Sequence, residues 1–573
     1  MGPAVRRSTA VVVWLGILAV GAMSGTRALH AAHLVGAEGG AAPMLQAAPV
    51  ADSTDVLEEV QVRVRDYIRD VRRSWDRRDR FDRYQPMEVV QEERPKVIQA
   101  LDEAAERLPG DDWIAGHRVG MRVKHERLDE AVEVARECQA SRWWCAALSG
   151  LAHHMRGDSA AAHHAFDDAL EAMPRERRCE WNEHVRHLLA GGIRSAYGDA
   201  DCQERDRLAE YIWWLADPFH LLPFNDRRSE HLARMVGMEL RCQQRALVGE
   251  VCRTPEYFDV VTLGWPDWLW SFEWGDSRPR PLGHRFVPPH GVAMEPFEAE
   301  PWDWALEQEA RFERVHLDYD LIHPLQQQTA LFRRGDSVRV VVAVDMHRHV
   351  LRGAPTLDMG VVFSREPPAS PVIHRVHGPP ERMLLDTLLP EREYLVSVEA
   401  LAEPSGAARS RFGVRLPSMS PEGLALSHPV LLDWGDALDR LADREEAEPV
   451  SLDSILDHII GSDRFRSGRE VGVFWEMYGL DGLEPEAVEV SITIREADEG
   501  RLRRLARWLG IAGPSQIQSL SWEEAVGAEA IQGRVLRLRL PDVEPGRYLL
   551  EVSVSTGDGE PMVVRRQMEI SAL

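Results

Sequence analysis

The sequence lacks the short motifs that identify most enzyme families. Its 573 residues contain no Gly-x-Ser-x-Gly nucleophile elbow, no P-loop, no dinucleotide-binding Gly-x-Gly-x-x-Gly and no His-Glu-x-x-His. We therefore expect no catalytic residues, no metal site and no cofactor, and a hydrolase is the weakest of the functions considered below.

Positive charge is also scarce. Lys and Arg number 68 against 93 Asp and Glu, which gives a net charge of −25. Nucleic acid and anionic lipid repel a chain this acidic, so neither is expected as a partner. Beyond the N-terminus, no apolar run approaches the roughly 20 residues that span a bilayer. Membrane contact is expected only through the N-terminal segment, if that segment stays uncleaved.

Cysteine is infrequent, and no Cys-x-x-Cys suggests a zinc site. The six cysteines are Cys138, Cys145, Cys179, Cys202, Cys242 and Cys252. An even, clustered set in an exported chain is typical of disulfides. Because stacked helix pairs keep sequence neighbours close together, the expected bonds are Cys138–Cys145, Cys179–Cys202 and Cys242–Cys252.

The N-terminus has the features of an export signal. Arg6 and Arg7 precede an apolar core over 11–22, and small residues follow it. We expect residues 1–28 to be a signal peptide and the Ala/Gly-rich residues 29–55 to be a disordered linker. An uncleaved anchor helix is the alternative. The expected location is periplasmic or extracellular, in a bacterial cell envelope.

Residues 56–245 have the apolar periodicity of helices. Residues 143–174 match the tetratricopeptide signature, and residues 113–141 are a weaker copy. The matching positions are Gly150, His153, Gly157, Asp158, Ala162, Phe166, Ala169, Leu170 and Pro174. The sequence thus predicts a tetratricopeptide-like helical array. The side chains on the concave face of such an array are not needed for its core. Ala147, Leu151 and His154 are expected to line that groove and to bind a protein or peptide partner.

A tryptophan- and proline-rich junction follows over 246–320. Its most prominent rings are Trp265, Trp268 and Trp270. If they are exposed, they could stack on sugars, which would make the protein a cell-surface carbohydrate-binding protein. If they are buried, they form a wedge that joins the helical half to the next domain, and this interpretation is favoured.

From residue 321 onward, β patterns occur twice. Phe332 and Gly335 open a valine-rich strand, Phe465 and Gly468 open another, and each copy later has a strand led by a tyrosine, Tyr394 or Tyr548. A helix inserted over Arg501–Gly510 would reconcile the spacing of the two copies. The pattern predicts two tandem antiparallel β-sandwiches over 321–418 and 455–573, joined by a linker over 419–454.

The boundary between helices and strands carries a family resemblance. Trp213–Arg234, read with Phe258–Asp267, resembles a GWxTD domain. In that family, which occurs in exported bacterial proteins, an aromatic-x-x-x-Asp-Pro hinge precedes an Asn-Asp/Glu helix, and a strand ending in a Gly-x-Pro-Asp turn follows. The central Gly-Trp-x-Thr-Asp sequence is missing here. The resemblance implies an envelope location and an interaction role, not a chemical activity.

The sequence therefore predicts a multidomain α+β protein, with a helical repeat array followed by two β-sandwiches. The predicted function is that of a non-enzymatic exported envelope protein, which acts as a protein-interaction scaffold through its helical groove. Carbohydrate binding through the tryptophan-rich junction is the alternative.

Overall fold

The computed structural model describes most of the chain from residue 53 onward. The described residues are 53–76, 88–189, 191–252, 297, 322–347, 349–354, 356–377, 382–402, 406–415, 423–442, 449–480, 487–497, 516–525, 527, 529–556 and 560–571. The expected signal peptide, the three tryptophans of the junction and the expected helix over 501–510 lie outside these residues. No helix within them is both long and apolar enough to cross a membrane.

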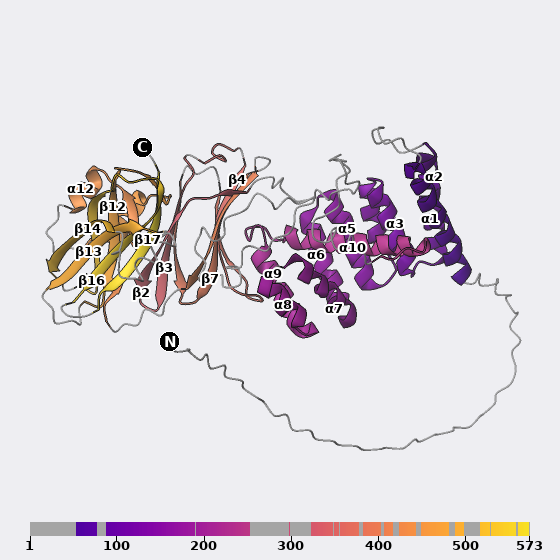
Figure 1. Ribbon diagram of the computed structural model, residues 1–573, viewed down its shortest axis with the longest axis horizontal. Coiled ribbons are helices and arrows are strands. Elements are labelled where there is room, and N and C mark those ends of the chain that lie inside the picture. The colour runs from indigo at the N-terminus through magenta and orange to yellow at the C-terminus, as the bar shows by residue number, and fades with distance from the viewer. Residues whose placement is uncertain are drawn as a thin grey trace, which may run out of the picture. The chain divides into compact units, whose positions relative to one another are not determined.

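The N-terminal part is helical (Figure 1). Its helices are α1 (Ser53–Asp76), α2 (Glu88–Arg107), α3 (Asp112–Lys124), α4 (Leu128–Arg136), α5 (Arg142–Arg156), α6 (Ser159–Ala172), α7 (Arg175–Glu183), the short 3-10 helix η1 (His184–Leu188), α8 (Gly191–Asp199), α9 (Cys202–Ala216) and α10 (Asp226–Leu247). Valines spaced four apart on α1, Val56, Val60 and Val64, pack against α2. The amphipathic face expected there is present, because period-four apolar residues form one stripe of a helix.

Helices α5 and α6 form the hairpin in which the sequence placed its helical repeat. Gly157, with φ 85°, ends α5 in the left-handed conformation that favours glycine. The helices approach closely at Gly150, where a Cβ atom would lie 2.6 Å from the Phe166 ring. The absence of a side chain at Gly150 lets Phe166 of α6 pack directly on α5.

The C-terminal part is made of strands. They are β1 (Ile322–Pro324), β2 (Gln328–Arg334), β3 (Ser337–Asp345), β4 (Leu357–Ser364), β5 (Val372–His377), β6 (Arg382–Pro390), β7 (Glu393–Ala402), β8 (Gly406–Arg415), β9 (Ala425–Leu426), β10 (Val430–Asp433), β11 (Arg464–Arg466), β12 (Glu470–Tyr478), β13 (Ala487–Glu496), β14 (Gln516–Ala525), β15 (Ile531–Arg539), β16 (Gly546–Ser555) and β17 (Met562–Ser571). A short helix, α12 (Asp436–Ala442), and the 3-10 turns η4 (Leu452–Ser454) and η5 (Leu456–His458) follow β10.

These strands form two sandwiches with matching strand orders. In the first, the sheet β1-β8-β7-β4-β5 and the sheet β2-β3-β6 enclose one core. In the second, β11-β17-β16-β13-β14 and β10-β12-β15 enclose another, and β9 also pairs with β12. The tandem arrangement is therefore present. Alternate residues of β3 and β12 face the cores as expected, beginning with Val338 and Val471.

Two turn and strand signals behave alike in both copies. Gly335 (φ 61°) and Gly468 (φ 73°) open β3 and β12. The buried Tyr394 donates its hydroxyl to the Pro390 carbonyl at 3.4 Å, and the buried Tyr548 donates to the Glu544 carbonyl at 2.6 Å. Each hydroxyl is thus bonded to backbone a few residues upstream, as in the tyrosine corner of immunoglobulin-like sandwiches.

The leading strands differ between the copies. β2, which carries Phe332, pairs with β3 in the three-stranded sheet, whereas β11, which carries Phe465, runs parallel to β17 in the five-stranded sheet. Phe332 therefore faces the space between the sandwiches, and Phe465 faces the core of its own sandwich. Both phenylalanines precede a glycine turn, but Phe332 and Phe465 pack in different cores.

The range expected to be a linker, 419–454, is part of the β structure. β10 pairs with β12, and Val430, Leu432 and Leu438 join a cluster that also contains Phe332 and Phe474. The ring centroids of these two phenylalanines lie 6.1 Å apart. The linker prediction was wrong here because the surrounding proline and acidic residues concealed a short strand with three consecutive buried apolar residues, Val430, Leu431 and Leu432. The two sandwiches consequently share a third core.

We expect Gly461→Ala to loosen this third core. A Cβ at Gly461 would lie 2.3 Å from the Asp345 nitrogen, in a place where the Asp345 N–H donates to the Gly461 carbonyl. Overpacking against fixed backbone costs about 1–3 kcal/mol, so amide hydrogen exchange in β3 and β10 should accelerate accordingly. Gly435→Ala is the matched control, since nothing lies within 4 Å of its Cβ. Equal exchange in both variants would contradict the shared core.

Candidate functional site

The connection between α9 and α10, residues 217–225, occupies the stretch that the sequence marked as a hinge. Asp217-Pro218 follows the end of α9, because the residue before a proline is disfavoured in the helical conformation. Asn225 caps α10: its side-chain oxygen accepts from the Arg228 N–H at 2.9 Å. Its amide donates to the Trp213 carbonyl at 2.6 Å, which ties the start of α10 to the end of α9. The helix runs to Leu247, beyond the expected end at Met238.

The first half of this connection, residues 217–222, is the docking loop, because it packs on the first five-stranded sheet. The Glu399 carboxylate of β7 accepts from the backbone N–H groups of His220 at 3.0 Å and Leu221 at 2.8 Å. The Leu221 side chain enters a space opened by Gly360, where a Cβ would approach it to 2.6 Å. The docking loop thus joins the helical part to the first sandwich.

Arginines of β8 hold the loop's carbonyl groups. Arg411 donates to the Asp217 carbonyl at 2.7 Å, and Arg409 donates to the Pro218 carbonyl at 2.7 Å. Arg411 also forms an ion pair with Glu399 at 3.2 Å, and both side chains are fully inaccessible to solvent. Burial lowers the pKa of the Arg411 guanidinium, and the nearby Glu399 opposes that shift. A buried charge needs such partners because it has lost its hydration.

The three groove residues predicted from the sequence are not open to a partner. Ala147, Leu151 and His154 are all buried, at 0%, 4% and 4% exposure. Helix α10 packs against α3, α5 and α6 and shares their core through Leu232, Val236 and Leu240. The prediction that these residues line an open groove for a partner was wrong, since α10 covers them.

His154 belongs to a buried polar cluster with two residues of α10. Its Nε2 lies 3.1 Å from Glu230 Oε2, and Arg234 contacts the other oxygen of Glu230 at 2.7 Å. Arg234 and His154 hold the pKa of Glu230 at about 2, against the opposing effect of burial. The polar residue that the sequence assigned to partner binding therefore fixes α10 instead.

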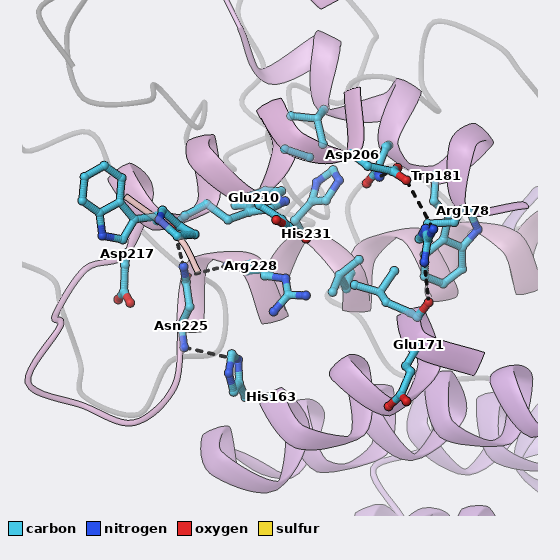
Figure 2. A pocket seen from close by; sticks show the side chains of 18 residues that line it. His163, Glu171, Arg178, Trp181, Asp206, Glu210, Asp217, Asn225, Arg228 and His231 are labelled. Carbon is cyan, nitrogen blue, oxygen red and sulfur yellow. Dashed lines mark hydrogen bonds and ion pairs between the residues drawn. The ribbon is translucent and has the colours of Figure 1, made fainter. Parts of the chain in front are cut away.

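A pocket of about 570 Å³ lies where α6, α7, α9 and the start of α10 meet (Figure 2). Trp181, Trp213 and Leu232 contribute apolar walls, and charged side chains stand among them. The labelled polar residues that line it are His163, Glu171, Arg178, Asp206, Glu210, Asp217, Asn225, Arg228 and His231. The sequence analysis missed this pocket: the stretch Trp213–Arg234 supplies part of its lining, but α6, α7 and other segments supply the rest, and no local motif joins these segments.

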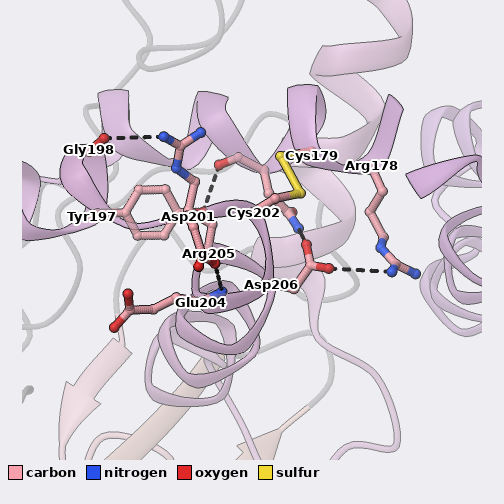
Figure 3. The surroundings of a disulfide bond; sticks show 10 residues. Arg178, Cys179, Tyr197, Gly198, Asp201, Cys202, Glu204, Arg205 and Asp206 are labelled. Carbon is pink, nitrogen blue, oxygen red and sulfur yellow. Dashed lines mark hydrogen bonds and ion pairs between the residues drawn. A yellow bond between two sulfur atoms is a disulfide. The ribbon is translucent and has the colours of Figure 1, made fainter. Parts of the chain in front are cut away.

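A disulfide fixes one wall of this pocket (Figure 3). Cys179 and Cys202 join α7 to the first turn of α9, and the neighbouring Arg178 and Asp206 form an ion pair across the same two helices at 3.3 Å. Asp206 also accepts from the Asn182 amide at 2.7 Å. The sequence signal for this wall was the cysteine pair, which the structure joins as expected, together with Cys138–Cys145 and Cys242–Cys252.

His231 forms part of the interior of the pocket. It is 5% exposed, and its ring centroid lies 5.1 Å from that of Trp213. Burial lowers the pKa of His231 to about 3, and the nearby His184 and Arg234 act in the same direction. Its Nδ1 has no hydrogen-bond partner among the residues that the structure describes. A buried polar atom without a hydrogen-bond partner can still form a hydrogen bond, for example with a ligand.

The remaining predicted sites are placed differently. The sugar-stacking candidates Trp265, Trp268 and Trp270 lie outside the described residues. Within the part of the chain that the structure describes, no group of three or more His, Cys, Asp or Glu side chains is arranged to hold a metal ion.

No protein-family model and no curated protein matches this chain. Among solved structures, the chain is similar to the FN1–FN3 domains of chicken CNTN1. That match has 11% sequence identity and a TM-score of 0.14, and it covers 44% of this chain and 68% of the other.

We expect Glu399→Ala to release the docking loop. The change leaves the buried Arg411 without its carboxylate, and breaking a buried pair in this way costs about 3–5 kcal/mol. Hydrogen exchange of the His220 and Leu221 amides, which donate to Glu399, measures the effect.

The matched control is Glu393→Ala on the same strand pair. Glu393 and Arg415 also join β7 to β8, at 2.6 Å, but both are exposed, so their loss should cost less than about 1 kcal/mol. Equal exchange rates in the two variants would contradict the assignment of the docking loop to the Glu399–Arg411 pair.

Proposed function

We propose that the protein is a non-enzymatic exported scaffold that binds a partner protein or peptide in the cell envelope. The three disulfides support export, because such bonds persist in oxidising compartments. The basic and then apolar N-terminal sequence supports the same location. The resemblance around residues 213–267 to GWxTD domains is consistent with both.

The observation that carries the binding role is the pocket between α6, α7, α9 and α10. It combines buried aromatic rings with charged groups and one unpartnered buried histidine atom, a combination typical of binding pockets. The docking loop borders the pocket at Asp217, and Asn225, which lies beyond the end of the loop, also lines the cavity. A partner would therefore meet a surface that the first sandwich supports.

The helical part is proposed to be a tetratricopeptide-like array with an occupied groove. The close approach at Gly150 and the short turn at Gly157 support repeat-type hairpins. Because α10 fills the concave side, binding is assigned to the pocket beside α10's first turn. Carbohydrate binding through the tryptophan-rich junction remains the second hypothesis, and it rests on residues outside those described.

The test is site-specific photo-crosslinking of the full chain in envelope extract. A photoreactive residue at Glu210, which is exposed and lines the pocket, should form one reproducible adduct that mass spectrometry identifies. The same residue at Glu204, exposed on another face of the same helix, is the control. Identical adducts from both positions, or none from Glu210, would argue against binding at the pocket.

A further inference from the structure

Only some of the charged side chains in the pocket have a partner of opposite charge. Its two arginines are paired with carboxylates: Arg178 contacts Asp206 at 3.3 Å, and Arg228 contacts Asp167 at 2.6 Å. Asp217 accepts from the Phe219 N–H at 3.1 Å. Glu171 and Glu210, in contrast, are exposed and have no ion-pair or hydrogen-bond partner within the described part of the chain. The charge available to a ligand is therefore negative.

The interior of the pocket adds groups that tolerate a cation. His231 is neutral near pH 7, since burial lowers its pKa to about 3, so it does not repel positive charge. His231 lines the pocket, and its unpartnered Nδ1 can accept a hydrogen bond in one tautomer. His163 likewise has its pKa lowered by burial and lies 3.4 Å from Asp167. Trp181 and Trp213 contribute indole rings, whose faces attract cations.

The geometry points to a pocket for the cationic side chain, arginine or lysine, of a basic segment in the partner polypeptide. Glu171 and Glu210 would pair with the guanidinium or ammonium group, the His231 Nδ1 would accept from it, and the indoles would contact its stem and charge. The net charge of −25 would steer a basic segment toward the chain. This inference rests on the proposed binding function and names the chemistry of the partner.

A sugar fits the same walls less well. Stacking of a pyranose requires an open ring face, and Trp181 and Trp213 are only 4% and 7% exposed. A cation needs only to approach within about 6 Å of a ring centroid. The two unpaired carboxylates also have no counterpart in a neutral sugar.

The test uses the full chain with the peptide acetyl-Gly-Gly-Arg-Gly-Gly-amide, its lysine analogue and its citrulline analogue. Citrulline keeps the shape of arginine but lacks the charge. Saturation-transfer NMR and calorimetry at physiological salt should detect binding of the arginine peptide, and the citrulline peptide should bind at least about tenfold more weakly. Glu171→Gln/Glu210→Gln should weaken binding of the arginine peptide by a similar factor.

The matched control is Glu489→Gln/Glu523→Gln, which changes the net charge equally. These exposed residues face each other across β13 and β14, far from α6 and α9 in the sequence. The affinity of this control variant for the arginine peptide should stay within about twofold of wild type. At physiological salt, the long-range attraction that one pair of charges exerts is screened.

Four outcomes would overturn the inference: no binding of the arginine peptide at millimolar concentration, equal binding of the citrulline peptide, equal losses in both double variants, or binding of maltotriose or chitotriose that Glu171→Gln/Glu210→Gln abolishes. The last outcome would identify a carbohydrate site instead. If crosslinking from Glu210 still succeeds while the arginine peptide fails to bind, the binding function stands and only the cationic chemistry is wrong.

Discussion

The buried ion pair between Glu399 and Arg411 is the interaction on which the join between helices and strands depends. Both charges are wholly removed from water, and each is satisfied by the backbone of the docking loop. A buried ion pair adds little net stability compared with apolar residues in the same place. It does restrict the geometry, because a displaced partner leaves a buried charge without compensation. The pair therefore specifies where residues 217–222 sit, and through them where α9 ends and α10 begins.

The pocket follows from that constraint and from one disulfide. Asn225 ties the start of α10 to Trp213, and Cys179–Cys202 ties α7 to α9, so the walls on both sides have fixed supports. Such supports reduce the ordering cost that a partner would otherwise meet on binding. Helix α10 meanwhile packs against α3, α5 and α6, and the His154–Glu230–Arg234 cluster links it to α5. The proposed binding site therefore lies beside the first turn of α10 and not at Ala147, Leu151 and His154.

The sandwiches likewise form one continuous support. Phe332 of the first and Phe474 of the second meet in a shared core, and Gly461 allows the backbones to touch. Arg334 of β2 makes two bonds to the buried Glu476 of β12, at 2.7 and 2.8 Å. Two domains joined only by a flexible linker would move independently. A shared apolar core and an ion pair with one fully buried partner, Glu476, join them instead.

The sequence by itself determined the features that depend on neighbours along the chain. Period-four valines gave α1, alternating valines gave β3 and β12, and short spacing gave the three disulfide pairs, because each signal is local. The tertiary structure decided the rest. His154 reads as a groove residue until α10 covers it, and residues 430–432 read as linker until β12 pairs with them. Arg178, Glu210 and His231 share no motif, and they form a pocket only because packing and a disulfide bring four helices together. A contact between two segments that are distant in the sequence produces no recognisable pattern in either segment.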